Sequence, residues 1–166
     1  MMLSSPPKEF SIPAKLKLDK KFQPCVVEPG DEHYRNGIFE FNISRLLAHI
    51  DAQAERFPIE FAALTTIPDY GGGANLDEET VLAADLSRPI LLAEISPGRY
   101  SLIDGNHRVA KARREAAPTV PARRIDCPQH VPFLTSTRAY ETYVEYWNGK
   151  VKDLQPPKAR RINRRV

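Results

Sequence analysis

The chain has 166 residues, of which 27% are charged and 42% hydrophobic, and its net charge is +3. These values are typical of a soluble globular protein with one domain. No apolar run reaches membrane-spanning length, and the first residues lack the basic-then-apolar pattern of a secretory signal, so we expect a cytoplasmic protein with no membrane partner. Cys25 and Cys127 form no Cys-x-x-Cys pair, which argues against a disulfide framework or a cysteine-based zinc site.

Much of the positive charge lies in the last nine residues, which contain Lys158, Arg160, Arg161, Arg164 and Arg165 and no acid. Without these five charges, residues 1–157 carry a net charge of −2. We therefore expect one domain over residues 1–157 and a basic tail over residues 158–166. Such a tail either contacts nucleic acid without sequence preference or is a disordered, solubilising segment, and both interpretations stay open.

The first third of the chain predicts an arm followed by a strand and a helix. Residues 1–30 contain five prolines and little periodicity, which indicates an irregular arm with one short strand at residues 25–27. Residues 31–37 are a polar turn, and the alternation over residues 38–43 predicts a strand. We expect Ser44 to cap a helix. Its inward residues would be Leu46, Leu47, Ile50, Ala54 and Phe57.

The middle of the chain contains a glycine-rich loop between two predicted elements. Residues 58–67 are compatible with a strand, and residues 77–86 predict a short helix with Val81, Leu82 and Leu86 inward. Residues 68–75 include three consecutive glycines and predict a mobile loop. This loop lacks the Lys-Ser/Thr end of a P-loop, so a lid or spacer is favoured over a phosphate cradle.

The pattern from residue 87 onward predicts a hairpin, a helix and a further strand. Residues 90–95 and 100–103 form an antiparallel pair around the turn at residues 96–99. A helix over residues 106–115 follows, Pro118 ends it, and residues 119–125 are a strand. We therefore predict an α/β (α+β) fold with a small mixed sheet flanked by helices.

The last predicted helix starts at a Thr137 cap and ends at Gly149. Its aromatic and apolar stripe predicts core packing rather than base stacking and consists of Tyr140, Tyr143, Val144 and Trp147. His130 and His107 have no further ligand at metal-binding spacing, so His130 is interpreted as structural.

The stretch from Tyr100 to Ala116 carries most of the functional information. A strand turns at Asp104, Gly105 and Asn106 into a helix whose start bears His107, Arg108 and, one turn later, Lys111. Free backbone N–H groups, the helix dipole and these cations predict a phosphate-binding site. Asp104 could cap the helix, hold a metal ion that bridges to the phosphate, or accept a proton.

A second candidate site lies at the predicted strand-to-helix junction of residues 37–45. It contains the polar side chains of Glu40, Asn42 and Arg45. Arg45 is retained as a further phosphate contact because its forked donors suit phosphate. The alternative is that Glu40 and Asn42 form the solvent side of an edge strand and that Arg45 is exposed.

The box around Gly105 resembles a known motif. Asp104-Gly105-Asn106-His107-Arg108-Val109-Ala110 follows the apolar run at residues 89–94 and a glycine-containing turn, and precedes Val120-Pro121-Ala122. Over residues 87–124 this is similar to the core of the ParB/sulfiredoxin superfamily, in which a short box of Gly, basic residues and Ala at a helix start binds nucleotide phosphates. The matching positions are Gly105, His107, Arg108 and Ala110.

The resemblance also limits the expected chemistry. Asn106 stands where sulfiredoxins have a reactive Cys and ParB proteins commonly have Glu, so peroxiredoxin repair is not implied. Asp before the Gly and His after it are closer to the free-serine kinases of the superfamily.

Three functions follow, in this order of preference. The first is a nucleotide-dependent enzyme for phosphoryl transfer or nucleotide hydrolysis, with catalytic Asp104 and His107, Mg2+ held by Asp104, and a nucleoside di- or triphosphate as cofactor. Its phosphate contacts would be Gly105, Asn106, His107, Arg108, Lys111 and Arg45. The second is a ParB-like nuclease or DNA-associated partition module that uses the basic tail. The third is a non-catalytic interaction domain.

Overall fold

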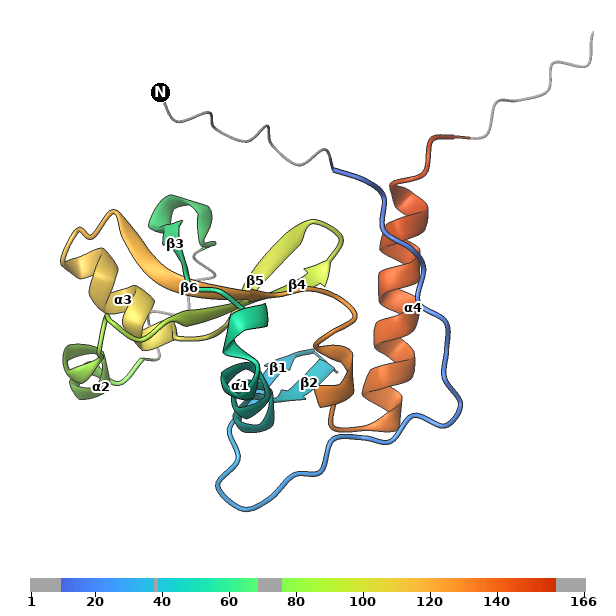
Figure 1. Cartoon of the computed structure of the whole chain (residues 1–166), viewed down its shortest axis with the longest axis horizontal. Coiled ribbons are helices and arrows are strands. Elements are labelled where there is room, and N and C mark those ends of the chain that lie inside the picture. The colour runs from blue at the N-terminus through green and yellow to red at the C-terminus, as the bar shows by residue number, and fades with distance from the viewer. Residues whose placement is uncertain (1–9, 38, 69–75, 158–166) are drawn as a thin grey trace, which may run out of the picture.

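The computed structural model describes residues 10–37, 39–68 and 76–157 (Figure 1). The strands are His33–Asn36 (β1), Phe39–Asn42 (β2), Glu60–Ala63 (β3), Ile90–Ser96 (β4), Arg99–Asp104 (β5) and Thr119–Ile125 (β6). The α-helices are Ile43–Ala52 (α1), Glu78–Ala83 (α2), Asn106–Arg114 (α3) and Thr137–Asp153 (α4). Short 3-10 helices occur at Ala54–Arg56, Leu64–Thr66 and Val131–Phe133. No helix in these ranges is both long and apolar enough to cross a membrane.

The predicted mixed α/β fold is confirmed by a four-stranded sheet of order β3-β6-β4-β5. β4 and β5 pair antiparallel, as predicted, and the turn between them contains Gly98 at φ +71°. β6 pairs parallel to β4, because α3 carries the chain back across the sheet, and antiparallel to β3. β1 and β2 form a separate antiparallel hairpin.

Successive side chains of β4 point to opposite faces of the sheet, and each face packs into its own hydrophobic core. Leu91, Ala93 and Ile95 pack into the larger core, with α1, β2 and α4. Ile90 and Leu92 pack into the smaller core with β5, β6 and α3. Figure 1 shows α2 and α3 at one end of the molecule and α4 at the other.

The N-terminal arm is irregular, as predicted, and it runs along α4 (Figure 1). Leu16 exchanges two backbone hydrogen bonds with the Asn148 side chain, at 2.7 and 2.9 Å. The Phe22 ring stacks on Tyr140 with centroids 3.9 Å apart. The strand predicted at residues 25–27 is wrong: Cys25 N–H bonds to the carbonyl of Leu134, but no ladder continues from it.

The start of α1 differs from the prediction. Asn42 caps the helix by accepting a hydrogen bond from Arg45 N–H at 3.0 Å, whereas Ser44 lies inside the helix and accepts from Glu32 N–H. The turn predicted at residues 31–37 contains β1, because Gly37 with φ +62° lets the chain reverse immediately before β2. Ala54 is exposed because α1 ends at Ala52.

Two further helix predictions need correction. Ser136 caps α4 instead of Thr137, and the helix continues through Gly149 to Asp153 because the buried Val151 anchors its last turns. In α2, Val81 is buried as predicted, but Leu82 is 63% exposed because so short a helix covers the core with one residue. The predicted aromatic stripe of α4 is buried as core. The loop predicted at residues 68–75 lies outside the described residues except for Pro68.

His130 lies in the larger core and has no solvent exposure. Its Nε2 is 2.7 Å from the Glu94 carbonyl oxygen, which requires Nε2 to donate, and its Nδ1 is buried without a partner. The rings of Phe41 and Tyr143 meet it edge-on. Burial therefore lowers the pKa of His130 to about 4.

We expect the free energy of unfolding to fall by about 2 kcal/mol between pH 7 and pH 5. The unfolded chain takes up a proton on His130 near pH 6.5, whereas the folded chain stays neutral down to about pH 4, so acid favours unfolding in this window. Urea titrations at several pH values measure this. The His130→Gln variant should be less stable at pH 7, but its free energy of unfolding should vary far less with pH. A flat wild-type profile would contradict the prediction.

Candidate functional site

The predicted site is built where β5 turns into α3. Gly105 adopts φ +109° and is the N-cap of α3, with no side-chain cap. A Cβ at this position would lie 2.6 Å from Ile90 Cγ2, so only glycine allows the helix start to pack this closely on β4. The first bond into the helix runs from Val109 N–H to the Gly105 carbonyl. The N–H groups of residues 106–108 therefore precede the helical ladder and remain available as donors.

Arg108 does not have the role expected of it. Its side chain is 13% exposed, and its Nη1 donates to the Pro89 carbonyl at 2.5 Å and to the Arg88 carbonyl at 3.3 Å. Its Nη2 donates to Asp104 Oδ2 at 2.8 Å. The guanidinium thus joins the α3 start to the segment before β4. Arg108 is therefore mostly buried and bonded within the fold, although it stands in the first turn of α3.

The Lys111 side chain likewise forms hydrogen bonds with backbone carbonyls. Its Nζ donates to the carbonyls of Leu82 and Ala84 at 2.9 and 2.8 Å, where α2 ends. A cation at a helix C-terminus stabilises the free carbonyls and the negative end of the dipole. The sequence spacing correctly placed Lys111 one turn after the helix start, but the structure directs its charge to α2.

Asp104 is 19% exposed and shares one carboxylate oxygen with Arg108. Its other oxygen, Oδ1, has no hydrogen-bond partner among the described residues. The same residues contain no group of three or more His, Cys, Asp or Glu side chains that could hold a metal ion. A metal ion at Asp104 would therefore take most of its ligands from water or from a bound molecule.

A pocket of about 290 Å³ opens beside the α3 start. His107 lines it and is half-buried, whereas Asn106 is exposed and does not line it. Across the pocket, Asp77 accepts hydrogen bonds from Thr80, which lower the pKa of Asp77, and nearby His107 lowers it further. The lining residues are Glu32, Leu47, Thr80, Ala84, Asp85, Arg88, Asp104, Gly105, His107 and Arg108.

Arg88 is the residue that sequence reasoning missed. Its side chain is exposed, lines the pocket and forms no ion pair within 4 Å among the described residues. It also borders a second hollow of about 160 Å³ on the other side of the Arg108–Asp104 pair. The sequence did contain a signal for Arg88, which stands two residues before β4. In an antiparallel pair the residues before β4 lie beside the residues after β5, where the predicted site begins.

Arg45 lies apart from this pocket. Its Nη2 is 3.1 Å from Glu28, and its Nε is 4.0 Å from Asp31. Hydrogen bonds from Glu28 N–H and from the Asn42 side chain lower the pKa of Asp31. Glu40 pairs with His33 and Arg35 on the β1–β2 hairpin. The junction at residues 37–45 is therefore a polar network in which two carboxylates contact Arg45, and Arg45 does not line the pocket at α3.

We expect Arg108→Ala to lower the free energy of unfolding by about 2 kcal/mol. The substitution leaves the Pro89 carbonyl and the Asp104 carboxylate without their partner in a partly buried place. Arg88→Ala is the matched control and should change stability by less than about 0.5 kcal/mol, because an exposed side chain is removed. Chemical denaturation of the two variants measures the difference, and equal stabilities would contradict the structural role of Arg108.

The sequence positions of the tail, Lys158, Arg160, Arg161, Arg164 and Arg165, lie outside the described residues, so the structure does not relate them to the pocket. Comparison of the chain with family models, curated protein sequences and solved structures found no match. The similarity to the ParB/sulfiredoxin superfamily therefore rests on the box itself.

Proposed function

We propose that the chain is a nucleotide-binding protein of the ParB/sulfiredoxin-like type that holds nucleotide phosphates at the start of α3. The observation that supports this most strongly is the start of the nine-residue helix α3. Its N-cap is a glycine without a side-chain cap, and it borders a pocket that His107 and Arg88 also line. Free N–H groups, the helix dipole and the Arg88 guanidinium, which forms no ion pair among the described residues, favour a phosphate there.

Each residue of the box then has a separate role. Gly105 allows the start of α3 to pack on β4, and the N–H groups of residues 106–108 donate to phosphate oxygens. Arg88 supplies a forked donor, and His107 supplies a ring nitrogen. Arg108 and Lys111 act as positioning residues, because their charged groups hold the α3 start and the end of α2.

The chemistry proposed for this site is phosphoryl transfer or nucleotide hydrolysis. Asp104 Oδ1 would either accept a proton from an attacking hydroxyl or hold Mg2+, while Arg108 keeps the carboxylate oriented. Mg2+ would neutralise phosphate charge there, and a single carboxylate oxygen fits an ion that keeps waters and phosphate oxygens as its other ligands. His107 would donate a proton or a hydrogen bond to the phosphate.

Arg88→Ala should weaken nucleoside triphosphate binding by about 1.5 to 3 kcal/mol, because a charge-assisted hydrogen bond is lost. Isothermal titration at pH 7 with Mg2+, after a thermal-shift screen of nucleotides, measures this. Arg45→Ala is the matched control and should bind the nucleoside triphosphate with the same affinity as the unmodified chain. The parent nucleoside should not bind. Unchanged affinity in Arg88→Ala and in His107→Ala would place any anion site elsewhere.

Deletion of residues 158–166 separates this proposal from the nucleic-acid alternative that the basic tail supports. The box is complete without the tail, so nucleotide affinity and turnover should be unchanged. If the tail contacts DNA or RNA, its loss should reduce the salt dependence of that binding by roughly one unit of slope per phosphate contact. Both assays are run on both chains at two salt concentrations. Salt-dependent nucleic-acid binding without nucleotide binding in the full chain would favour the alternative.

A further inference from the structure

A larger hollow of about 510 Å³ lies at the opposite end of β5 from the α3 start. It runs beside Arg99 to Ser101, whereas the phosphate pocket adjoins Asp104, so the two lie roughly 10 to 16 Å apart along the strand. Its volume is in the range of small-molecule sites. The lining residues are Asn36, Thr66, Pro68, Leu92, Ile95, Ser96, Gly98, Arg99, Tyr100, Ser101, Arg124 and Tyr146.

The charged residues of this hollow are both cations. Arg99 is exposed and has no ion pair among the described residues. Arg124 contacts the Glu60 carboxylate through Nε only, which leaves its two terminal nitrogens without hydrogen bonds in that part of the chain. Among the described residues that line the hollow there is no Asp or Glu. The hollow therefore favours a ligand with negative charge.

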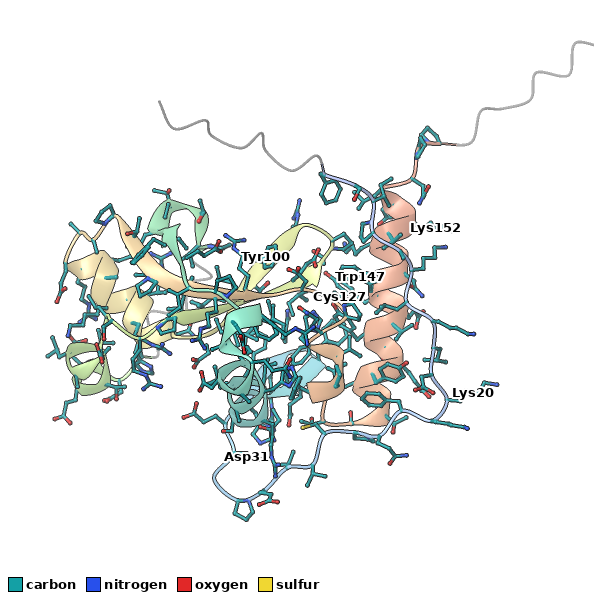
Figure 2. All side chains as sticks on the ribbon, viewed as in Figure 1. Lys20, Asp31, Tyr100, Cys127, Trp147 and Lys152 are labelled. Atoms are coloured by element: carbon teal, nitrogen blue, oxygen red, sulfur yellow. The ribbon has the colours of Figure 1, made fainter. Side chains whose placement is uncertain are left out.

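Two tyrosine rings give the hollow flat apolar walls. The Arg124 guanidinium lies over the Tyr100 ring, 4.6 Å from its centroid, and the Tyr100 hydroxyl donates to Asp126. Figure 2 shows Tyr100 on the sheet, apart from Trp147 and Cys127 beside α4. Tyr146 comes from α4, where it packs against Phe39. Because each ring is held by other contacts, the walls are formed before any ligand binds.

We propose that this hollow is a second binding site, for a small planar aromatic anion. The ring of the ligand packs against the parts of the Tyr100 and Tyr146 rings that Arg124 and Lys150 do not cover. Its carboxylate or phosphate accepts hydrogen bonds from Arg99 and Arg124. None of these residues belongs to the box at α3, so the site does not depend on the proposed nucleotide-binding function.

The test uses the full chain and four probes in isothermal titration and ligand-observed NMR. The aromatic probes 4-hydroxybenzoate and phenyl phosphate distinguish a carboxylate ligand from a phosphate ligand. Cyclohexanecarboxylate and inorganic phosphate are their non-aromatic controls. We expect saturable binding of at least one aromatic probe and at least about tenfold weaker binding of its control, because the control lacks the flat π-face.

Three variants locate the binding. Arg99→Ala removes an exposed cation and should weaken the aromatic probe about tenfold. Ser101→Trp fills the hollow without changing its charge and should abolish binding, with circular dichroism to verify folding. Arg88→Ala, in the other pocket, is the matched arginine control and should bind 4-hydroxybenzoate normally.

Several results would overturn the inference. They are no saturable binding of either aromatic probe, equal binding of the non-aromatic controls, or unchanged affinity in both Arg99→Ala and Ser101→Trp. Binding of a single-stranded oligonucleotide by the full chain, lost in Arg99→Ala and without binding of either small aromatic probe, would overturn it in favour of a nucleic-acid surface.

Discussion

The arrangement of the central box depends on the hydrogen bonds of the Arg108 guanidinium. This one group satisfies the Pro89 carbonyl before β4 and the carboxylate of Asp104, the last residue of β5. The start of β4 and the end of β5 therefore meet at the first turn of α3. Gly105 makes the approach possible, since no Cβ fits against Ile90. The geometry of the free N–H groups is therefore set by a cation whose terminal nitrogens already donate to acceptors of the protein.

The other basic residues of α3 have similar roles. Lys111 binds the carbonyls at the end of α2, and Arg113 donates to the Ile67 carbonyl at 2.8 Å. Arg114 forms an ion pair with Glu78, and hydrogen bonding to Arg114 lowers the pKa of that carboxylate. The sequence of α3 indicates a basic surface, but these basic side chains are bonded to neighbouring segments of the protein. Fewer of their charges are therefore available to a nucleic-acid phosphate backbone than the composition indicates.

Two accessible arginines without ion pairs among the described residues lie at the two ends of the hairpin. Arg88 precedes β4 at the α3 end, and Arg99 begins β5 at the turn end. β5 is an edge strand of the sheet. The two pockets lie at its two ends, where the strand continues into surface segments. This placement separates a phosphate-type site built from backbone donors from a hollow built from arginine and tyrosine side chains.

The sequence by itself determined the hairpin, the turn into α3, the following strand and the aromatic core face of α4, because each depends on local turn chemistry or on a period of 2 or 3.6 residues. It misplaced caps and ends, such as Ser44 for Asn42 and Gly149 for Asp153, where packing with distant segments decides between neighbouring positions. Only the tertiary structure decided which cations face a pocket. Hydrogen bonds between residues 19 to 29 positions apart direct Arg108 and Lys111 to backbone carbonyls, and no local pattern specifies such pairs.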